Sequence, residues 1–327
     1  MFALGIPASC DKGLKLVKSP IVILDGGMSR ELVRIGAPFR QPEWSAYALI
    51  EDPGSVRQVH SEFITAGADV ITTNSYAIVP FHIGDERFRT EGRALSDLAG
   101  RLAREAAESS ETAARPVKVA GSIPPVFGSY RPELFDAEIA PSVLAPIIEG
   151  LSPHVDIWLA ETHSSIAEVR AIRAALGKDP RPLWISFSLN DDDDLTEAVL
   201  TGRAEPTLRS GESIADVVAA AREIGAESLL FNCSEAEIME AAIRTAASLD
   251  PTLKIGVYAN AFVPETKELD ANTGLCDIRD DLLPRTYLTF AQRWVDAGAT
   301  IVGGCCGIGT AHIAELARAL KPARVSV

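Results

Sequence analysis

The sequence predicts an α/β protein, a single-domain (β/α)8 barrel of the TIM type, on three observations. The chain has 327 residues, a length that one such barrel reaches. Short runs rich in β-branched residues recur along it, and each is mostly continuous apolar, as expected for strands covered on both faces. Longer stretches with apolar residues at helical spacing separate these runs, and eight such alternations favour a closed parallel barrel.

Eight strands are expected. They span residues 21–27, 70–76, 117–123, 155–162, 183–189, 228–234, 254–260 and 300–306. The clearest helical patterns between them cover residues 87–109, 164–176, 213–224, 235–249 and 282–297. An open doubly wound sheet is the alternative. Such a sheet usually carries a G-x-G-x-x-G phosphate motif after its first strand, and here Asp25, Gly26 and Gly27 end that strand without one.

Three long connections cover residues 124–137, 190–211 and 261–281. In a barrel these are loops that follow strands on the C-terminal face, where binding groups gather. Four consecutive aspartates at 191–194 are expected to form a solvated loop. A cation site is the alternative, although the run lacks the spaced ligands and the glycine of a calcium loop. Residues 1–20 are expected to form an N-terminal arm, and residues 21–327 the barrel domain.

The amino-acid composition limits the classes of partner that the protein is expected to bind. Hydrophobic residues make up 47% of the chain, enough for a large core. The net charge of −14, without a Lys/Arg cluster, disfavours nucleic acid or an anionic membrane as a partner. No run of about 18 apolar residues occurs, so no membrane-spanning segment is expected. Small-molecule substrates are the expected partners, and the sequence does not fix an oligomeric state.

The five cysteines, at positions 10, 233, 276, 305 and 306, do not have the spacing of a disulfide-stapled secreted module. The N-terminal residues also lack the basic and apolar regions of a secretory signal. A cytoplasmic location is therefore expected. Cys10 and Cys276 lie in the arm and in a loop, and both are expected to be unpaired and to bind no metal.

Thiols at two strand ends point to a metal site. Cys305 and Cys306 are adjacent and follow Gly303 and Gly304, which let the backbone approach closely. Cys233 follows the sixth strand, two strands from the eighth around a closed ring, so the three thiols can converge. Three soft sulfur ligands with one open position suit a catalytic zinc ion. Alternatively, each thiol is inert and buried, or the adjacent pair forms a vicinal disulfide.

Polar groups at other strand ends suit an amino-acid substrate. Asp25 and Glu161 would bind its ammonium group. The hydroxyl of Thr73 and the backbone N–H groups of Gly26 and Gly27 would bind its carboxylate. Helix capping and ordinary loop solvation are the alternative roles.

Three further side chains lie near this expected site. Trp44, in an early loop, either packs in the core or forms a wall for a cationic methyl donor. His163 is expected to do no more than line the mouth of the barrel, and His312 is expected to be structural. Neither histidine is expected to bind the metal, because three thiolates already serve it.

Taken in order, these segments resemble the homocysteine S-methyltransferase family from about residue 20 to 320, nearly the whole chain. Asn-Cys at 232–233 and Gly-Gly-Cys-Cys-Gly at 303–307 are the specific motifs. Supporting segments lie at 25–31, 44–46, 72–76 and 161–162. The resemblance implies a (β/α)8 barrel that holds Zn²⁺ on three cysteines, here Cys233, Cys305 and Cys306. It also implies that Asp25 and Glu161 hold the homocysteine amino group.

The resemblance further implies a substrate-binding set around these residues. It places Gly26, Gly27 and Thr73 near the amino-acid end of homocysteine. Asn232 and Trp44 are expected to complete the set.

The methyl donor is expected to be a sulfonium compound, S-methylmethionine or S-adenosylmethionine, and the product methionine. Family members that use betaine have a Tyr directly after the glutamate, where this chain has Thr162, and here Ala77 follows Tyr76. Sulfonium users resemble this chain in their Glu-Thr and Trp-Ser-Ala segments. A betaine or other onium donor and a selenocysteine-type acceptor are the alternatives within the family. Outside it, the alternatives are a non-catalytic zinc- and thiol-binding barrel and a metal-free enzyme that binds phosphate on the 303–309 loop.

Overall fold

The computed structural model describes residues 20–109, 116–263 and 277–321. The arm expected at residues 1–20 falls outside these ranges except for its last residue, and Cys10 and Cys276 also lie outside them. The domain boundary at residue 20 therefore stays a prediction. In the described part of the chain, no helix has both the length and the apolar character needed to cross a bilayer.

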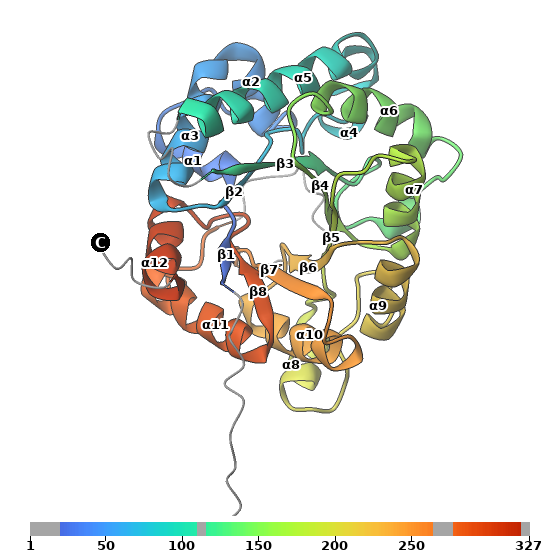
Figure 1. Cartoon of the computed structure of the whole chain (residues 1–327), viewed down its shortest axis with the longest axis vertical. Helices are drawn as coiled ribbons and strands as arrows, with labels where there is room; N and C mark the ends of the chain where they lie inside the picture. Colours follow the sequence, from blue (N-terminus) through green and yellow to red (C-terminus); the bar gives the residue numbers. More distant parts are fainter. Residues whose placement is uncertain (1–19, 110–115, 264–276, 322–327) are drawn as a thin grey trace, which may run out of the picture.

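Eight parallel strands form the barrel, each within a predicted strand except that β4 and β8 start or end one residue outside. They are β1 (Val22–Ile23), β2 (Val70–Thr72), β3 (Lys118–Ile123), β4 (Ile157–His163), β5 (Leu183–Phe187), β6 (Ser228–Asn232), β7 (Lys254–Tyr258) and β8 (Ala299–Val302). Neighbouring strands pair in chain order, and β1 pairs with β8. A bridge between Leu24 and Val70, with Asp25 N donating to Val70 O at 3.1 Å, joins β1 to β2 and closes the ring. The predicted fold class is confirmed (Figure 1).

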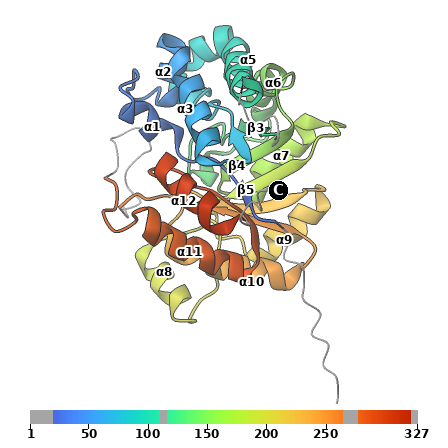
Figure 2. The same ribbon diagram turned by 60° about the vertical axis from the view of Figure 1, so that its left-hand side comes forward.

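Helices surround this ring (Figure 1). They are α1 (Met28–Arg34), α2 (Ser45–Glu51), α3 (Pro53–Ala66), α4 (Pro80–Ile83), α5 (Asp85–Ser109), α6 (Ala140–Leu151), α7 (Ile166–Leu176), α8 (Asp193–Leu200), α9 (Ile214–Glu223), α10 (Ala236–Leu249), α11 (Pro284–Ala297) and α12 (Thr310–Leu320), with a 3-10 turn, η1, at Pro132–Leu134. All five predicted helices are confirmed within two residues at either end, as α5, α7, α9, α10 and α11. Figure 2 shows α10, α11 and α12 side by side along one flank, and the same neighbours pack together.

Side chains that alternate along the strands build two buried layers. One face of each strand packs against the helices in the main core. The other face contributes to a separate apolar cluster that fills the barrel interior, composed of Leu24, Val70, Ala120, Ile157, Leu159, Trp184, Leu230, Tyr258 and Ile301. The barrel interior is therefore a packed body rather than a pore.

Several strands end earlier than the sequence predicted. β1 stops at Ile23 and β8 at Val302, so Asp25 and Cys305 lie in the turns that follow. Close packing of these two turns is the reason. A Cβ at Gly26 would lie 2.2 Å from Ile308 O, and one at Gly304 would lie 2.1 Å from Ile308 Cγ2. The glycines let the two turns fold over each other, which a continued strand would prevent.

Candidate metal centre

The three predicted thiols lie together at the barrel mouth. Cys233 Sγ is 3.8 Å from Cys306 Sγ, and Cys305 Sγ is 4.0 Å from Cys306 Sγ. All three sulfurs lie within 4.8 Å of one another, and none is in a disulfide. Zinc–sulfur bonds of about 2.3 Å at tetrahedral angles separate two sulfurs by about 3.8 Å. The spacing and chemistry of this donor set therefore fit a zinc ion.

Backbone contacts between turns hold the thiols in place. Cys233 directly follows β6 in the left-handed region, with φ of 51°. Cys305 N donates to Ala259 O at 2.9 Å, and Gly304 N donates to Asp25 O at 3.0 Å. Because the turns after β1, β7 and β8 are tied to one another, the sulfurs are fixed relative to the nearby carboxylate.

Asn232 lies beneath the thiols and is fully buried. Its amide nitrogen donates to Thr162 Oγ1 at 2.8 Å and lies 3.9 Å from Cys305 Sγ. Its oxygen accepts from Ser186 Oγ at 2.7 Å and from Thr162 N at 3.1 Å. Asn232 is not among the residues that line the cavity. Its contacts support Cys305 from below.

The two predicted carboxylates are both buried near the thiols. Asp25 accepts hydrogen bonds from Thr72 N at 2.7 Å and from Thr72 Oγ1 at 3.0 Å. Glu161 accepts from Ser122 Oγ and, at 3.4 Å, from Tyr258 OH. Neither carboxylate is bonded to a Lys or Arg among the described residues, so the pair is available to a cation.

Burial acts strongly on these two acids. It raises the pKa of Asp25 from 3.8 to about 8, and the charge of Glu161 adds to the effect while hydrogen bonds from Thr72 oppose it. Burial likewise raises the pKa of Glu161 from 4.5 to about 7, with a further contribution from the charge of Cys233. A bound ammonium group would favour the ionised form of both acids.

The groups expected at the carboxylate end of the substrate differ in availability. Thr73 Oγ1 lies 2.9 Å from Ser75 Oγ and accepts from Ser122 N at 3.0 Å, and Thr73 lines the cavity. Gly27 N donates to Ile308 O at 2.9 Å and is therefore already used. Within the described ranges, Gly26 N has no protein acceptor.

A cavity of about 1660 Å³ covers the thiols, both carboxylates and Thr73. Its aromatic lining includes Trp44, Tyr76 and Phe81. Trp44 is half-buried and also packs against the core, so it takes part in both of its expected environments. A cavity of this size exceeds the usual range for one small ligand and leaves room for two substrates.

The histidines have structural contacts. His163 Nε2 lies 3.1 Å from Ile123 O and His163 Nδ1 lies 3.6 Å from Glu168 Oε1, and His163 does not line the cavity. His312 Nε2 lies 2.9 Å from Leu282 O. The structural role expected of His312 agrees with this contact.

The four aspartates at 191–194 match the predicted solvated loop only in part, because Asp193 and Asp194 are exposed but begin a helix and Asp191 is mostly buried. Asp193 and Asp194 occupy the first turn of α8, where negative charge is favourable. Asp191 faces the cavity with its side chain 14% exposed, and Asp191 Oδ1 accepts from Arg209 Nη2 at 2.7 Å. Burial raises the pKa of Asp191, which the charge of Arg209 opposes. The pairing with Arg209, from the same long connection, is the reason the run is not simply solvated.

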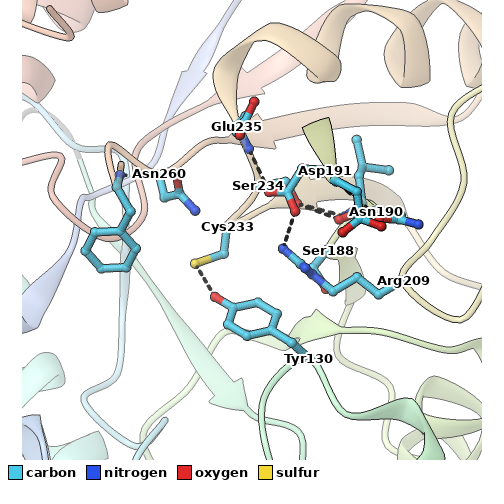
Figure 3. A network of polar contacts seen from close by, with 12 residues as sticks. Tyr130, Ser188, Asn190, Asp191, Arg209, Cys233, Ser234, Glu235 and Asn260 are labelled. Carbon is cyan, nitrogen blue, oxygen red and sulfur yellow. Dashed lines mark hydrogen bonds and ion pairs between the residues drawn. The ribbon is translucent and has the colours of Figure 1, made fainter. Parts of the chain in front are cut away.

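Two residues at the thiols were not identified from sequence. Tyr130 OH donates to Cys233 Sγ at 2.9 Å, and the Arg209 guanidinium lies 4.4 Å from the centre of the Tyr130 ring (Figure 3). Both residues belong to long connections that were correctly expected to follow strands at the mouth. No local motif marks either residue, and their only signal was their presence in those loops.

Comparisons with known proteins agree with this site. A model of the family described as homocysteine S-methyltransferase matches residues 22–320. A homocysteine S-methyltransferase from Escherichia coli (strain K12) is 30% identical, covering 92% of this chain and 96% of that protein. A selenocysteine Se-methyltransferase from Brassica oleracea var. italica is 26% identical, covering 87% of this chain and 84% of that protein.

A solved structure is similar as well. The metallated form of the homocysteine methyltransferase MmuM from Escherichia coli has a TM-score of 0.72 and 28% identity, covering 92% of this chain and 96% of that one. The family model and the relatives extend over nearly the whole barrel, and the three thiols, the buried carboxylates and the cavity lie within the matched range. This chain belongs to the homocysteine S-methyltransferase family.

Proposed function

We propose that this enzyme transfers a methyl group from a sulfonium compound, S-methylmethionine or S-adenosylmethionine, to the thiol of homocysteine, with zinc held by Cys233, Cys305 and Cys306. The observation that carries the proposal is the spacing of these three sulfurs. Cys306 Sγ lies 3.8 Å from Cys233 Sγ and 4.0 Å from Cys305 Sγ. When bound, zinc would keep the homocysteine sulfur ionised at neutral pH.

The reaction balances without a general acid. The homocysteine sulfur loses its proton to solvent and forms a bond to the methyl carbon. The bond between that carbon and the donor sulfonium breaks, and its electron pair stays on the donor sulfur, which leaves as a neutral thioether. The protein therefore has to activate and align the nucleophile rather than protonate the leaving group.

Side chains on one side of the thiols suit the amino-acid part of homocysteine. Asp25 and Glu161 would hold its ammonium group between them, as buried carboxylates that lack a protein cation. Thr73 and the free amide of Gly26 would hold its carboxylate. Since Gly27 N is bonded to Ile308 O, Gly27 would serve the site through its close packing rather than through its N–H.

The charge and lining of the cavity support a cationic donor. Three thiolates would give the site a negative charge even with a divalent metal bound, and the two carboxylates would add to it once a bound ammonium group favours their ionised form. Trp44, Tyr76 and Phe81 offer aromatic walls, and aromatic faces attract sulfonium and ammonium groups alike. Thr162 stands where betaine users have a tyrosine, which favours the sulfonium donor.

The alternatives are separable. A selenocysteine-type acceptor is a second candidate because a selenocysteine Se-methyltransferase matches most of this chain. Phosphate binding on the 303–309 loop is disfavoured, because the amides of Gly303, Gly304 and Cys305 are bonded to Val257, Asp25 and Ala259. A non-catalytic barrel would bind zinc and homocysteine without turnover.

The testing experiment is zinc content per chain, measured under reducing conditions on the wild type and on Cys305→Ser. Wild-type protein should hold about one equivalent and the variant much less. Methyl transfer to homocysteine and to selenocysteine is then measured with S-methylmethionine, S-adenosylmethionine and betaine. Zinc-free but folded wild-type protein would remove the metal from the proposal. Zinc-loaded protein that is active only with betaine would overturn the assigned donor.

A further inference from the structure

The loop between β3 and α6 reaches across the barrel mouth to one of the thiols. Tyr130, in this loop, donates its hydroxyl to Cys233 Sγ at 2.9 Å, although β3 and β6 are three strands apart in the ring. The adjacent Ser129 Oγ lies 2.6 Å from the hydroxyl oxygen of Tyr76, which follows β2. Bonds to two opposite parts of the mouth hold the loop, so the contact with Cys233 belongs to a fixed arrangement.

A second pair of residues fixes the Tyr130 ring. The Arg209 guanidinium lies over the ring at 4.4 Å, and Arg209 Nη2 donates to Asp191 Oδ1 at 2.7 Å (Figure 3). Asp191 Oδ2 also accepts from Glu235 N at 3.2 Å, which ties the pair to the turn after β6. Arg209 Nε is buried and has no hydrogen-bond partner among the described residues. The guanidinium is thus held against the ring at the expense of one of its own hydrogen bonds.

Both residues joined by the hydrogen bond between Tyr130 and Cys233 have an unfavourable backbone conformation. Tyr130 has a φ of 66° and Cys233 a φ of 51°, both in the left-handed region that residues other than glycine seldom adopt. Such conformations persist only where the surroundings enforce them, and they gather at functional sites. Here they bring a hydroxyl and a thiol together from different parts of the chain.

We propose that Tyr130 is a positioning residue for the metal centre, whose hydroxyl directs the Cys233 sulfur while Arg209, anchored by Asp191, holds the Tyr130 ring. The proposal rests on the metal site of the proposed function. A hydrogen bond to a thiolate ligand fixes its direction and takes up part of the negative charge that three thiolates concentrate on one ion. Partners of this kind typically change metal affinity by about 10–100-fold when they are removed.

The test is Tyr130→Phe, which removes the hydroxyl and keeps the ring, in otherwise intact protein. Tyr47→Phe is a matched control, because the Tyr47 ring also lies under a guanidinium, that of Arg40 at 4.1 Å, but does not line the cavity. Zinc affinity is measured by competition with a chelator, without donor or acceptor. Tyr130→Phe should weaken zinc binding at least tenfold. The thiolate-to-metal absorption band of the cobalt-substituted protein should also shift. Tyr47→Phe should match the wild type in both measurements.

A second variant tests the role of Arg209. Arg209→Met should weaken zinc binding in the wild type, and it should have a much smaller effect in Tyr130→Phe, where the hydroxyl that it positions is absent. Equal zinc affinity and an unshifted cobalt spectrum in Tyr130→Phe would overturn the proposal. Equal effects of Arg209→Met in both backgrounds would overturn the part assigned to Arg209. Wild-type protein that binds no zinc would instead overturn the proposed metal site, and this proposal with it.

Discussion

Replacement of Asp25 by asparagine is predicted to stabilise the protein at alkaline pH and to remove its hold on homocysteine. Asp25 is 6% exposed, and both hydrogen bonds to its carboxylate come from Thr72. Asparagine can keep both, because its oxygen accepts from the Thr72 N–H and its amide donates to the Thr72 hydroxyl oxygen. The substitution therefore removes the charge while it preserves the shape and the hydrogen bonds.

The size of the effect follows from the pKa of Asp25, which burial raises from 3.8 to about 8. Between these values the folded state keeps a proton that the unfolded chain has released, so the stability of the wild type falls as the pH rises. At about 1.4 kcal/mol for each pH unit, the loss reaches about 5 kcal/mol at pH 8 and changes little at higher pH. Asparagine suffers no such loss. The two proteins should be similar near pH 4, and the variant should be the more stable one at pH 8.

Urea unfolding of reduced, zinc-loaded protein at pH 5, 6.5 and 8 measures this difference, with Asp280→Asn as an exposed control in the turn before α11. Homocysteine should stabilise the wild type more than Asp25→Asn, because its ammonium group favours the ionised carboxylate. The reasoning is refuted if Asp25→Asn is no more stable than the wild type at pH 8 without homocysteine. An equal gain from homocysteine in both proteins would instead contradict the assigned contact with the ammonium group.

Three further predictions concern the metal and the two substrates. Cys306→Ser should lose zinc and methyl transfer together, and retained zinc with full turnover would exclude a three-cysteine site. Glu161→Gln removes a charge-assisted hydrogen bond worth about 1.5–3 kcal/mol, so the KM for homocysteine should rise about 10–100-fold while that for the donor changes little. Because the pKa of Glu161 is about 7, the wild-type KM for homocysteine should fall between pH 6 and pH 8, and this slope should flatten in the variant. Trp44→Leu should raise the KM for the donor about fivefold, as loss of one cation–π contact of about 1 kcal/mol implies, and an unchanged donor KM in initial-rate measurements would contradict a wall role.

The barrel could be predicted because its strands are nearly continuous apolar runs, which report burial on both faces directly. Helices with a strong apolar stripe, such as α5 and α11, were equally clear. α6 was not identified, since Pro141 and Pro146 read locally as helix breakers. In the structure the first lies in the opening turn, where proline is tolerated, and packing keeps the second inside the helix. Tertiary contacts, which a local pattern does not contain, decide such cases.

The thiols could be predicted because both cysteine motifs directly follow strands, and a barrel brings the ends of its strands to one mouth. The same rule found Asp25 and Glu161. It could not find Tyr130, because the path of a long loop depends on where its side chains find partners. The rule also could not predict that Asp191 pairs with Arg209, because a run of four aspartates does not indicate which arginine lies beside it in the fold.

The non-glycine residues that adopt positive φ gather at one end of the barrel, although Gly128 and Gly307 adopt it at that end as well. At the end opposite the cavity, where helices lead into strands, the chain uses glycine in this conformation, at Gly67, Gly177, Gly225 and Gly298. At the cavity end, the four non-glycine residues with positive φ in the described ranges all line the cavity: Trp44, Tyr130, Thr162 and Cys233. Glycine would relieve the strain at each of these four positions but would remove the indole, hydroxyl or thiol found there. Buried carboxylates without a cationic partner add a second unfavourable term at the same end. The described residues thus concentrate backbone strain and unpaired buried carboxylates at the cavity end, as expected where a site is organised for binding and chemistry rather than for stability.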